Sequence, residues 1–183
     1  HAGDHLLDVG ELQAVLAEQC KAVSHQLVVV GLVARCAREG GDWFRAIGTE
    51  KSTGTKLISV SGDCTLPGIY EYPFGIDVAE ILADCGANSE NTQAVQISGP
   101  SGICIASDEF RRRIGFEDLS TAGAFMVFDN HRDMFEVAHN FAHFFAHESC
   151  GFCTPCRVGT TLLKNCMDKI DRKSTRLNSS HSR

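Results

Sequence analysis

The spacing of apolar residues changes along the chain and predicts strands in its middle and helices towards its end. Short runs rich in β-branched and aromatic residues, or alternating with polar ones, predict strands at 57–60, 69–72, 94–98, 103–106 and 124–128. Helical spacing is found at 77–84, which Asp77 can cap, and from about 131 to 147, which Asn130 can cap.

The order of these elements indicates the fold class. The first two strands are separated by a Leu66-Pro67-Gly68 turn and therefore form a hairpin, which is followed by a helix and further strands. This order predicts an α+β fold, in which a helix lies across one face of a small sheet and a helical region follows. Upstream of the sheet we expect a loosely helical segment at 11–27, a strand at 28–30 and a loop at 41–56.

Charge and hydropathy exclude two classes of protein. The chain carries 17 basic and 23 acidic residues and a formal charge of −6, whereas a nucleic-acid binder needs clustered lysine and arginine. The longest apolar stretch, 27–34, has eight residues, far fewer than the roughly 20 that cross a bilayer. We therefore expect neither nucleic-acid binding nor direct membrane insertion.

The two ends of the sequence indicate a fragment. The chain begins at His1 rather than at a methionine. Residues 171–183 are polar and basic, which predicts a disordered tail, and they resemble translated sequencing-adapter sequence. We leave this non-native tail out of the functional interpretation and expect the chain to be a piece of a longer protein.

Cysteines carry the strongest chemical signal. The odd count of nine and the close spacing of Cys150, Cys153 and Cys156 do not suit a disulfide framework, so we expect a reducing, cytoplasmic setting. A CxxCxxC loop can turn three thiolates onto one iron-sulfur cube, whereas a zinc site generally takes one CxxC pair from a loop and a second pair from elsewhere. The spacing favours an iron-sulfur cluster over zinc.

The residues around the three cysteines suit an anionic cluster. Gly151 permits unusual backbone dihedrals and Pro155 stiffens the loop. Thr160 can cap a helix to about residue 170, whose positive end would point towards the cluster, and Arg157 adds a positive charge unless it is an ordinary surface arginine. Cys166 is the nearest candidate for a fourth ligand, but its helical position favours simple packing.

The other cysteines and a set of histidines have simpler interpretations. We expect five scattered cysteines to be small buried apolar residues: Cys20, Cys36, Cys64, Cys85 and Cys104. His139, His143 and His147 recur every four residues on one helix face, so an adjacent pair could ligate a transition metal. A hydrated polar stripe is the favoured interpretation, because the sequence shows no further ligand nearby except the thiolates. Nucleophilic Cys-His catalysis is disfavoured, since the cysteine spacing is explained by metal ligation.

The motif at 148–159, ESCGFCTPCRVG, resembles the cluster loop of the NADH- and FMN-binding flavoprotein subunit of respiratory complex I. The same loop occurs in the diaphorase subunits of NAD-reducing hydrogenases and NAD-dependent formate dehydrogenases. The runs at 40–62 and 66–75, GGDWFRAIGTEKSTGTKLISVSG and LPGIYEYPFG, are similar to the segment entering that family's β-grasp-like domain. The resemblance extends from Gly40 to about Ile170 and is nearer to the hydrogenase branch.

The resemblance implies four regions. Residues 1–55 would be a poorly assigned segment and loop leading out of a missing flavin domain, and 56–129 a β-grasp-like domain. Residues 130–170 would begin a helical iron-sulfur domain, and 171–183 form the tail. The function implied is an electron relay from FMN through a [4Fe-4S] cluster to partner subunits of a multi-subunit NADH-linked complex. If that complex is membrane-bound, the chain would lie at its cytoplasmic face.

The chain also departs from the family pattern. It contains no glycine-rich run of the GxGxxG type for FMN and NADH, and the family's fourth cluster cysteine would lie beyond its last residue. We therefore expect Cys150, Cys153 and Cys156 to bind the cluster in a chain that cannot oxidise NADH by itself. The alternative is a zinc-stabilised or β-grasp interaction module without redox activity.

Overall fold

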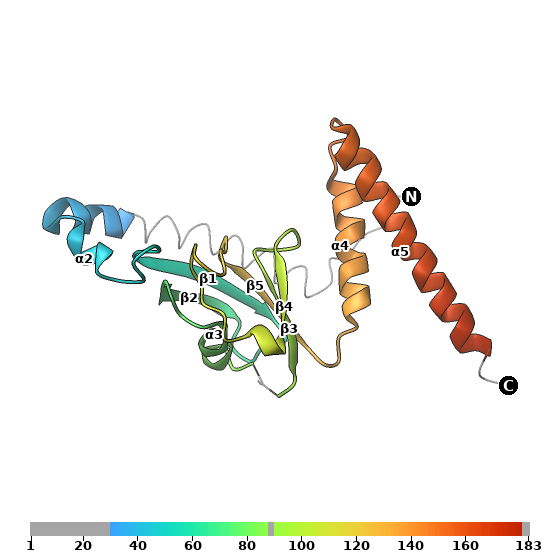
Figure 1. The fold of residues 1–183 in the computed structure, drawn as a ribbon, viewed down its shortest axis with the longest axis horizontal. Coiled ribbons are helices and arrows are strands. Elements are labelled where there is room, and N and C mark those ends of the chain that lie inside the picture. The colour runs from blue at the N-terminus through green and yellow to red at the C-terminus, as the bar shows by residue number, and fades with distance from the viewer. Residues whose placement is uncertain (1–29, 88–89, 181–183) are drawn as a thin grey trace, which may run out of the picture. The chain divides into compact units, whose positions relative to one another are not determined.

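The computed structural model describes residues 30–87 and 90–180, and of 171–180 the backbone alone. The chain divides into two compact units, one ending at Asn130 and one beginning at His131. The first contains the sheet and the second contains two helices (Figure 1).

The first unit is built around a five-stranded mixed sheet. Its strands are β1 (Thr55–Gly62), β2 (Gly68–Pro73), β3 (Thr92–Ile97), β4 (Ile103–Ala106) and β5 (Ala124–Asp129). Their order across the sheet is β2-β1-β5-β3-β4, with β1 parallel to β5 and all other neighbours antiparallel. The first and last strands therefore pair at the centre of the sheet (Figure 1).

Helix α3 (Val78–Asp84) packs against the sheet and completes the core of this unit. Its apolar side is buried in one cluster with side chains of the central strands, as the helical spacing predicts. The residues of this cluster that are less than 2 % exposed include Ile58, Val60, Val78, Ile81, Val95, Phe125 and Val127. The α+β prediction, with a β-grasp-like sheet and helix before a helical region, is confirmed.

The segment before the sheet differs from its prediction. Residues 30–39 are helical, so the strand expected at 28–30 is wrong at Val30, and the rest of that strand and the 11–27 segment lie outside the described residues. Alanine and arginine are strong helix formers, and Arg35 pairs with Glu39 one turn later at 3.1 Å, which together outweigh the β-branched Val30 and Val33. The expected loop contains the short helix α2 (Asp42–Arg45).

The second unit is a pair of helices, α4 (Met134–Glu148) and α5 (Thr154–Ser180), joined by a short loop. The cap of α4 is Asp133 rather than Asn130, because the Asp133 carboxylate accepts a hydrogen bond from the Phe135 amide at 2.8 Å. Helix α5 begins six residues before Thr160 and continues to Ser180, through part of the segment expected to be a disordered tail. None of the described helices combines the length and the apolar character that a bilayer span requires.

Candidate metal centres

The three motif cysteines lie in the loop that joins α4 to α5 and in the first turn of α5. Cys150 follows the end of α4, Cys153 immediately precedes α5, and Cys156 is in its first turn. All three are exposed free thiols. Gly151 has φ +76, a left-handed conformation that glycine adopts without steric cost, so its predicted role in the loop is confirmed.

The start of α5 corrects the predicted position of the helix end. The Arg157 amide donates to the Cys153 carbonyl at 2.9 Å, which closes the first turn. Pro155 is tolerated there because amides in the first turn need no partner within the helix. Thr160 is not a cap, since its hydroxyl donates to the Cys156 carbonyl within the helix at 2.7 Å. The positive end of the helix dipole therefore lies directly at Cys153 and Cys156.

Arg157 folds back over the cysteine loop. Its Nη1 donates to the Gly151 carbonyl at 3.0 Å, so its charge is held beside the loop rather than free in solvent. Ser149 Oγ lies 3.4 Å from Cys156 Sγ and also accepts from the Gly151 amide at 3.4 Å. The loop thus offers a guanidinium, a hydroxyl and helix amides to an anionic group.

The chemistry of this loop bears on which metal group it would hold. Three thiols from one loop, with a guanidinium and helix amides beside them, suit an anionic polynuclear cluster ligated by thiolates. A structural zinc site generally takes one CxxC pair from a loop and a second pair of ligands from elsewhere. The donor set of the loop therefore fits an iron-sulfur cluster better than one zinc ion.

The remaining cysteines divide differently from the prediction. Cys85 is buried and Cys64 is half-buried, as expected for apolar packing residues. Cys104 and Cys166 are exposed, which corrects the packing expected for both, and Cys36 is intermediate. Cys104 lies on β4, an edge strand with one uncovered side. Cys20 lies outside the described residues.

The packing of Cys64 leads to a test of which thiols are reactive. Burial raises the pKa of the Cys64 thiol to about 11. At pH 8 only about one Cys64 in a thousand is then ionised, and the thiolate is the form that reacts with iodoacetamide. We expect peptide mapping to show Cys64 alkylated far more slowly in the folded chain than in the urea-unfolded chain. Equal rates in the two states would contradict the packing described here.

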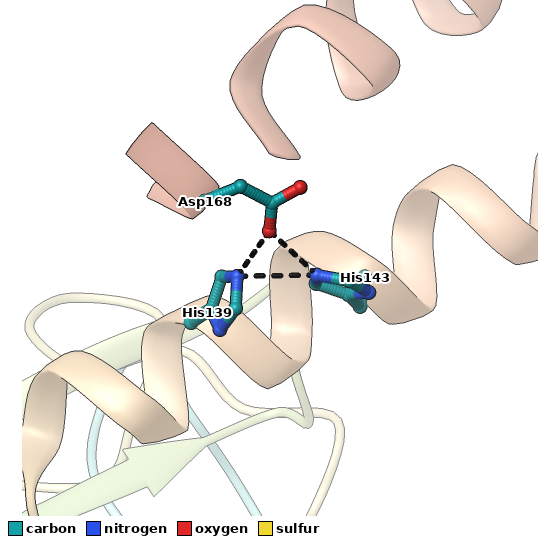
Figure 2. Close-up of side chains that lie close together, drawn as sticks. All are labelled: His139, His143 and Asp168. Atoms are coloured by element: carbon teal, nitrogen blue, oxygen red, sulfur yellow. Dashed lines mark hydrogen bonds and ion pairs between the residues drawn. The ribbon is translucent and has the colours of Figure 1, made fainter. Parts of the chain in front are cut away.

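A second group of candidate ligands lies on the facing sides of α4 and α5 (Figure 2). His139 Nε2 is 2.6 Å and His143 Nε2 is 3.0 Å from the same oxygen, Asp168 Oδ1, and the two nitrogens are 3.1 Å apart. The side chains are 26 %, 43 % and 21 % exposed for His139, His143 and Asp168. His147 does not join them, because it is 87 % exposed and contacts Glu148 at 3.2 Å.

This arrangement corrects the interpretation of the histidines as a simple hydrated stripe. The sequence shows the i, i+4 pair but not Asp168, which lies 25 residues after His143 and meets it only through the packing of α5 on α4. Hydrogen bonds from His139, His143 and Lys164, in that order, hold the pKa of Asp168 far below its usual value. Lys164 Nζ lies 3.1 Å from the other oxygen, Oδ2.

Comparison with known proteins identifies the region that contains the cysteine loop and the group formed by His139, His143 and Asp168. Residues 136–181 match the NADH-ubiquinone oxidoreductase-F iron-sulfur binding region. The NAD-reducing hydrogenase HoxS subunit alpha of Cupriavidus necator is 50% identical over 128 residues, which are 69% of this chain and 21% of the relative. An F-type subunit of the NADH-quinone oxidoreductase of Rhizobium meliloti is 34% identical over 146 residues, which are 75% of this chain and 35% of the relative.

A solved structure shows the same likeness in three dimensions. It is the crystal structure of an NAD+-reducing [NiFe]-hydrogenase in the air-oxidized state, with a TM-score of 0.72 and 45% sequence identity. The match covers 76% of this chain and 25% of that chain, so the present sequence spans between about a fifth and a third of these relatives. The chain is therefore a homologue of the F-type subunits of NADH-quinone oxidoreductase and of the HoxS alpha subunit, and its residues 136–181 form an NADH-ubiquinone oxidoreductase-F iron-sulfur binding domain.

Proposed function

We propose that the chain is the electron-relay part of an NADH-linked flavin and iron-sulfur oxidoreductase subunit. Cys150, Cys153 and Cys156 bind a [4Fe-4S] cluster, which passes electrons from FMN to partner subunits. The observation that carries this proposal is the position of three exposed thiols around the first turn of α5, inside the matched iron-sulfur region. Bound there, the cluster supplies one-electron chemistry that amino acids lack.

The protein groups hold the cluster and set its environment. The first-turn amides of α5 and the Arg157 guanidinium place positive charge beside the thiolates, which favours the reduced, more negative cluster. Cys166 is not placed to be the fourth ligand, because ten residues of helix separate it from Cys156 by about 15 Å. We propose that the fourth ligand comes from outside this chain. We also propose that hydride transfer from NADH to FMN belongs to the longer parent protein.

Exposed apolar side chains support the proposed partner subunits. Phe152, between two of the cysteines, is 88% exposed, and Leu162 and Leu163 on α5 are more than half exposed. Phe152 lies in the cysteine loop and the two leucines lie on α5, and exposed large apolar residues of this kind are typical of surfaces that another protein covers. We propose that partner subunits pack against this helical unit and that the complex works in the cytoplasm or at the cytoplasmic face of a membrane.

Anaerobic reconstitution with iron and sulfide tests the proposal. With a thiol in the buffer taking the place of the fourth ligand, the chain should take up both elements and develop a broad visible absorption that dithionite bleaches. Uptake of zinc by the same cysteines, together with failure to incorporate iron and sulfide, would favour the zinc-stabilised module instead.

Substitution of Arg157 tests the electrostatic part of the proposal. Arg157→Gln removes the positive charge that lies against the cysteine loop, so the reduced cluster loses a stabilising interaction. We expect a lower reduction potential in a spectroelectrochemical titration of the reconstituted chain, with cluster content retained. Arg113→Gln, on the sheet unit, is the control and should leave the potential unchanged. An unchanged potential in Arg157→Gln would show that this charge does not act on the cluster.

A further inference from the structure

The contacts among His139, His143 and Asp168 cannot all be hydrogen bonds. Three atoms, two imidazole nitrogens and one carboxylate oxygen, form a closed triangle with sides of 2.6, 3.0 and 3.1 Å (Figure 2). A neutral imidazole nitrogen either carries one proton or presents one lone pair, and an ionised carboxylate only accepts. Each side of the triangle therefore needs a donor at one end and an acceptor at the other.

With Asp168 ionised, no placement of protons meets this requirement. If both Nε2 atoms carry a proton, both can donate to Asp168 Oδ1, but then two donors face each other across 3.1 Å. If one Nε2 is unprotonated, its lone pair faces the carboxylate oxygen instead. A single cation bound to all three atoms satisfies them at once, because each then presents a lone pair to it.

We propose that His139, His143 and Asp168 bind a divalent first-row transition metal ion, of which Zn²⁺ is the representative. A triangle with sides of 2.6, 3.0 and 3.1 Å has its centre about 1.7 Å from each corner. Bonds of about 2.0–2.1 Å to all three atoms place the ion about 1.2 Å outside their plane. One face of the ion then stays open for water or another ligand.

The surroundings of the triangle are those of a metal site. Histidines at i and i+4 present their rings on the same face of α4, and imidazole and carboxylate ligands suit zinc and its neighbours. Lys164 Nζ donates a hydrogen bond to Asp168 Oδ2, which leaves Oδ1 facing the imidazoles. Carboxylates that bind metals are commonly hydrogen-bonded in this way. The ring of Phe135 stacks roughly parallel to that of His139, with the two ring centroids 6.0 Å apart.

This ion would join α4 to α5. Ala142 is the one buried residue of α4, and none of the described side chains of α5 is buried. Little apolar surface is therefore buried between these two helices. A metal bridge supplies a cross-link that this packing lacks. Asp168 lies twelve residues from Cys156, about 18 Å along the helix, so the site is separate from the cysteine loop.

Metal titration of the full chain tests this site. In a background with Cys150, Cys153 and Cys156 replaced by serine, Co²⁺ is added and then displaced by Zn²⁺, and binding is followed by visible absorption and metal analysis. We expect one ion per chain. Because even groups that only support ligands change metal affinity by about 10–100-fold, His139→Ala and Asp168→Asn should each weaken binding by at least about 100-fold. His147→Ala, on the same helix but outside the triangle, should bind like the background.

Zinc X-ray absorption on the background chain checks the ligands without any further substitution. The first shell should contain nitrogen and oxygen alone. A sulfur-containing shell, no binding at micromolar zinc, or equal affinity in the background, His139→Ala and Asp168→Asn would overturn the proposal. Circular dichroism confirms folding of each variant, and His143→Gln replaces any that loses helix. The result does not depend on the iron-sulfur proposal, because the cluster ligands are absent from these proteins.

Discussion

Cys153→Ser is expected to abolish stable cluster assembly in the reconstituted chain. Cys153 immediately precedes α5 and lies between the other two proposed ligands, so its loss leaves the cluster only two of the three thiolates that this chain would supply. Serine keeps the shape of the side chain, and the Cys153 carbonyl that closes the first turn is retained. We expect bound iron and sulfide to fall by about tenfold or more, and the dithionite-bleachable absorption to fall with them.

Cys166→Ser is the matched control for this substitution. Cys166 is also an exposed free thiol on α5, but it lies far from the loop along the helix. Iron and sulfide content should therefore equal that of the unsubstituted chain. If Cys166→Ser lost the cluster and Cys153→Ser kept it, the assignment of the ligands to the loop would be wrong.

Phe125→Ala is expected to destabilise the sheet unit by about 3–5 kcal/mol. Phe125 is 1 % exposed on β5, which pairs with both β1 and β3, so the substitution opens a cavity at the centre of the core. The chain has a single tryptophan, Trp43, in the same unit, and its fluorescence in urea reports the unfolding. The midpoint should move to a clearly lower urea concentration.

Phe116→Ala controls for the loss of a phenylalanine as such. Phe116 is 74% exposed and contacts Phe74 in a tilted pair 5.8 Å apart. Its replacement should change the free energy of unfolding by no more than about 0.5 kcal/mol. Comparable losses from the two substitutions would contradict the assignment of Phe125 to the core.

The strands were predictable from local sequence, but their arrangement was not. The predicted 103–106 strand coincides with β4, and the other four differ from their predictions by a few residues at their ends. The parallel pairing of β1 with β5 joins Ser59 to Ala124, residues separated by most of the unit. Neither strand contains a local signal for this pairing, which follows from burying one shared core under α3.

The three cysteines proposed as ligands could be found from the sequence because they are close together in it, whereas the start of α5 was wrongly predicted. Pro155 suggests a loop and Thr160 a helix cap, but proline is accommodated in a first turn and Thr160 bonds within the helix. Starting α5 at Thr154 brings its positive end onto the cysteines themselves. The helix end therefore acts more directly on this loop than the sequence indicated.

The histidine group shows what sequence spacing cannot supply. His139 and His143 follow from helical periodicity, but any of several acidic residues could have faced them. Asp168 is selected by the length of the loop between α4 and α5 and by the packing of the two helices. A correctly placed start of α5 is the signal that could have brought Asp168 opposite the pair.

Mössbauer spectroscopy of the chain reconstituted anaerobically with ⁵⁷Fe and sulfide tests the central claim most directly. The account predicts a [4Fe-4S] spectrum whose iron sites change on dithionite reduction, present in the unsubstituted chain and lost in Cys153→Ser. A spectrum of isolated iron ions, or the same spectrum after all three motif cysteines are replaced by serine, would contradict it.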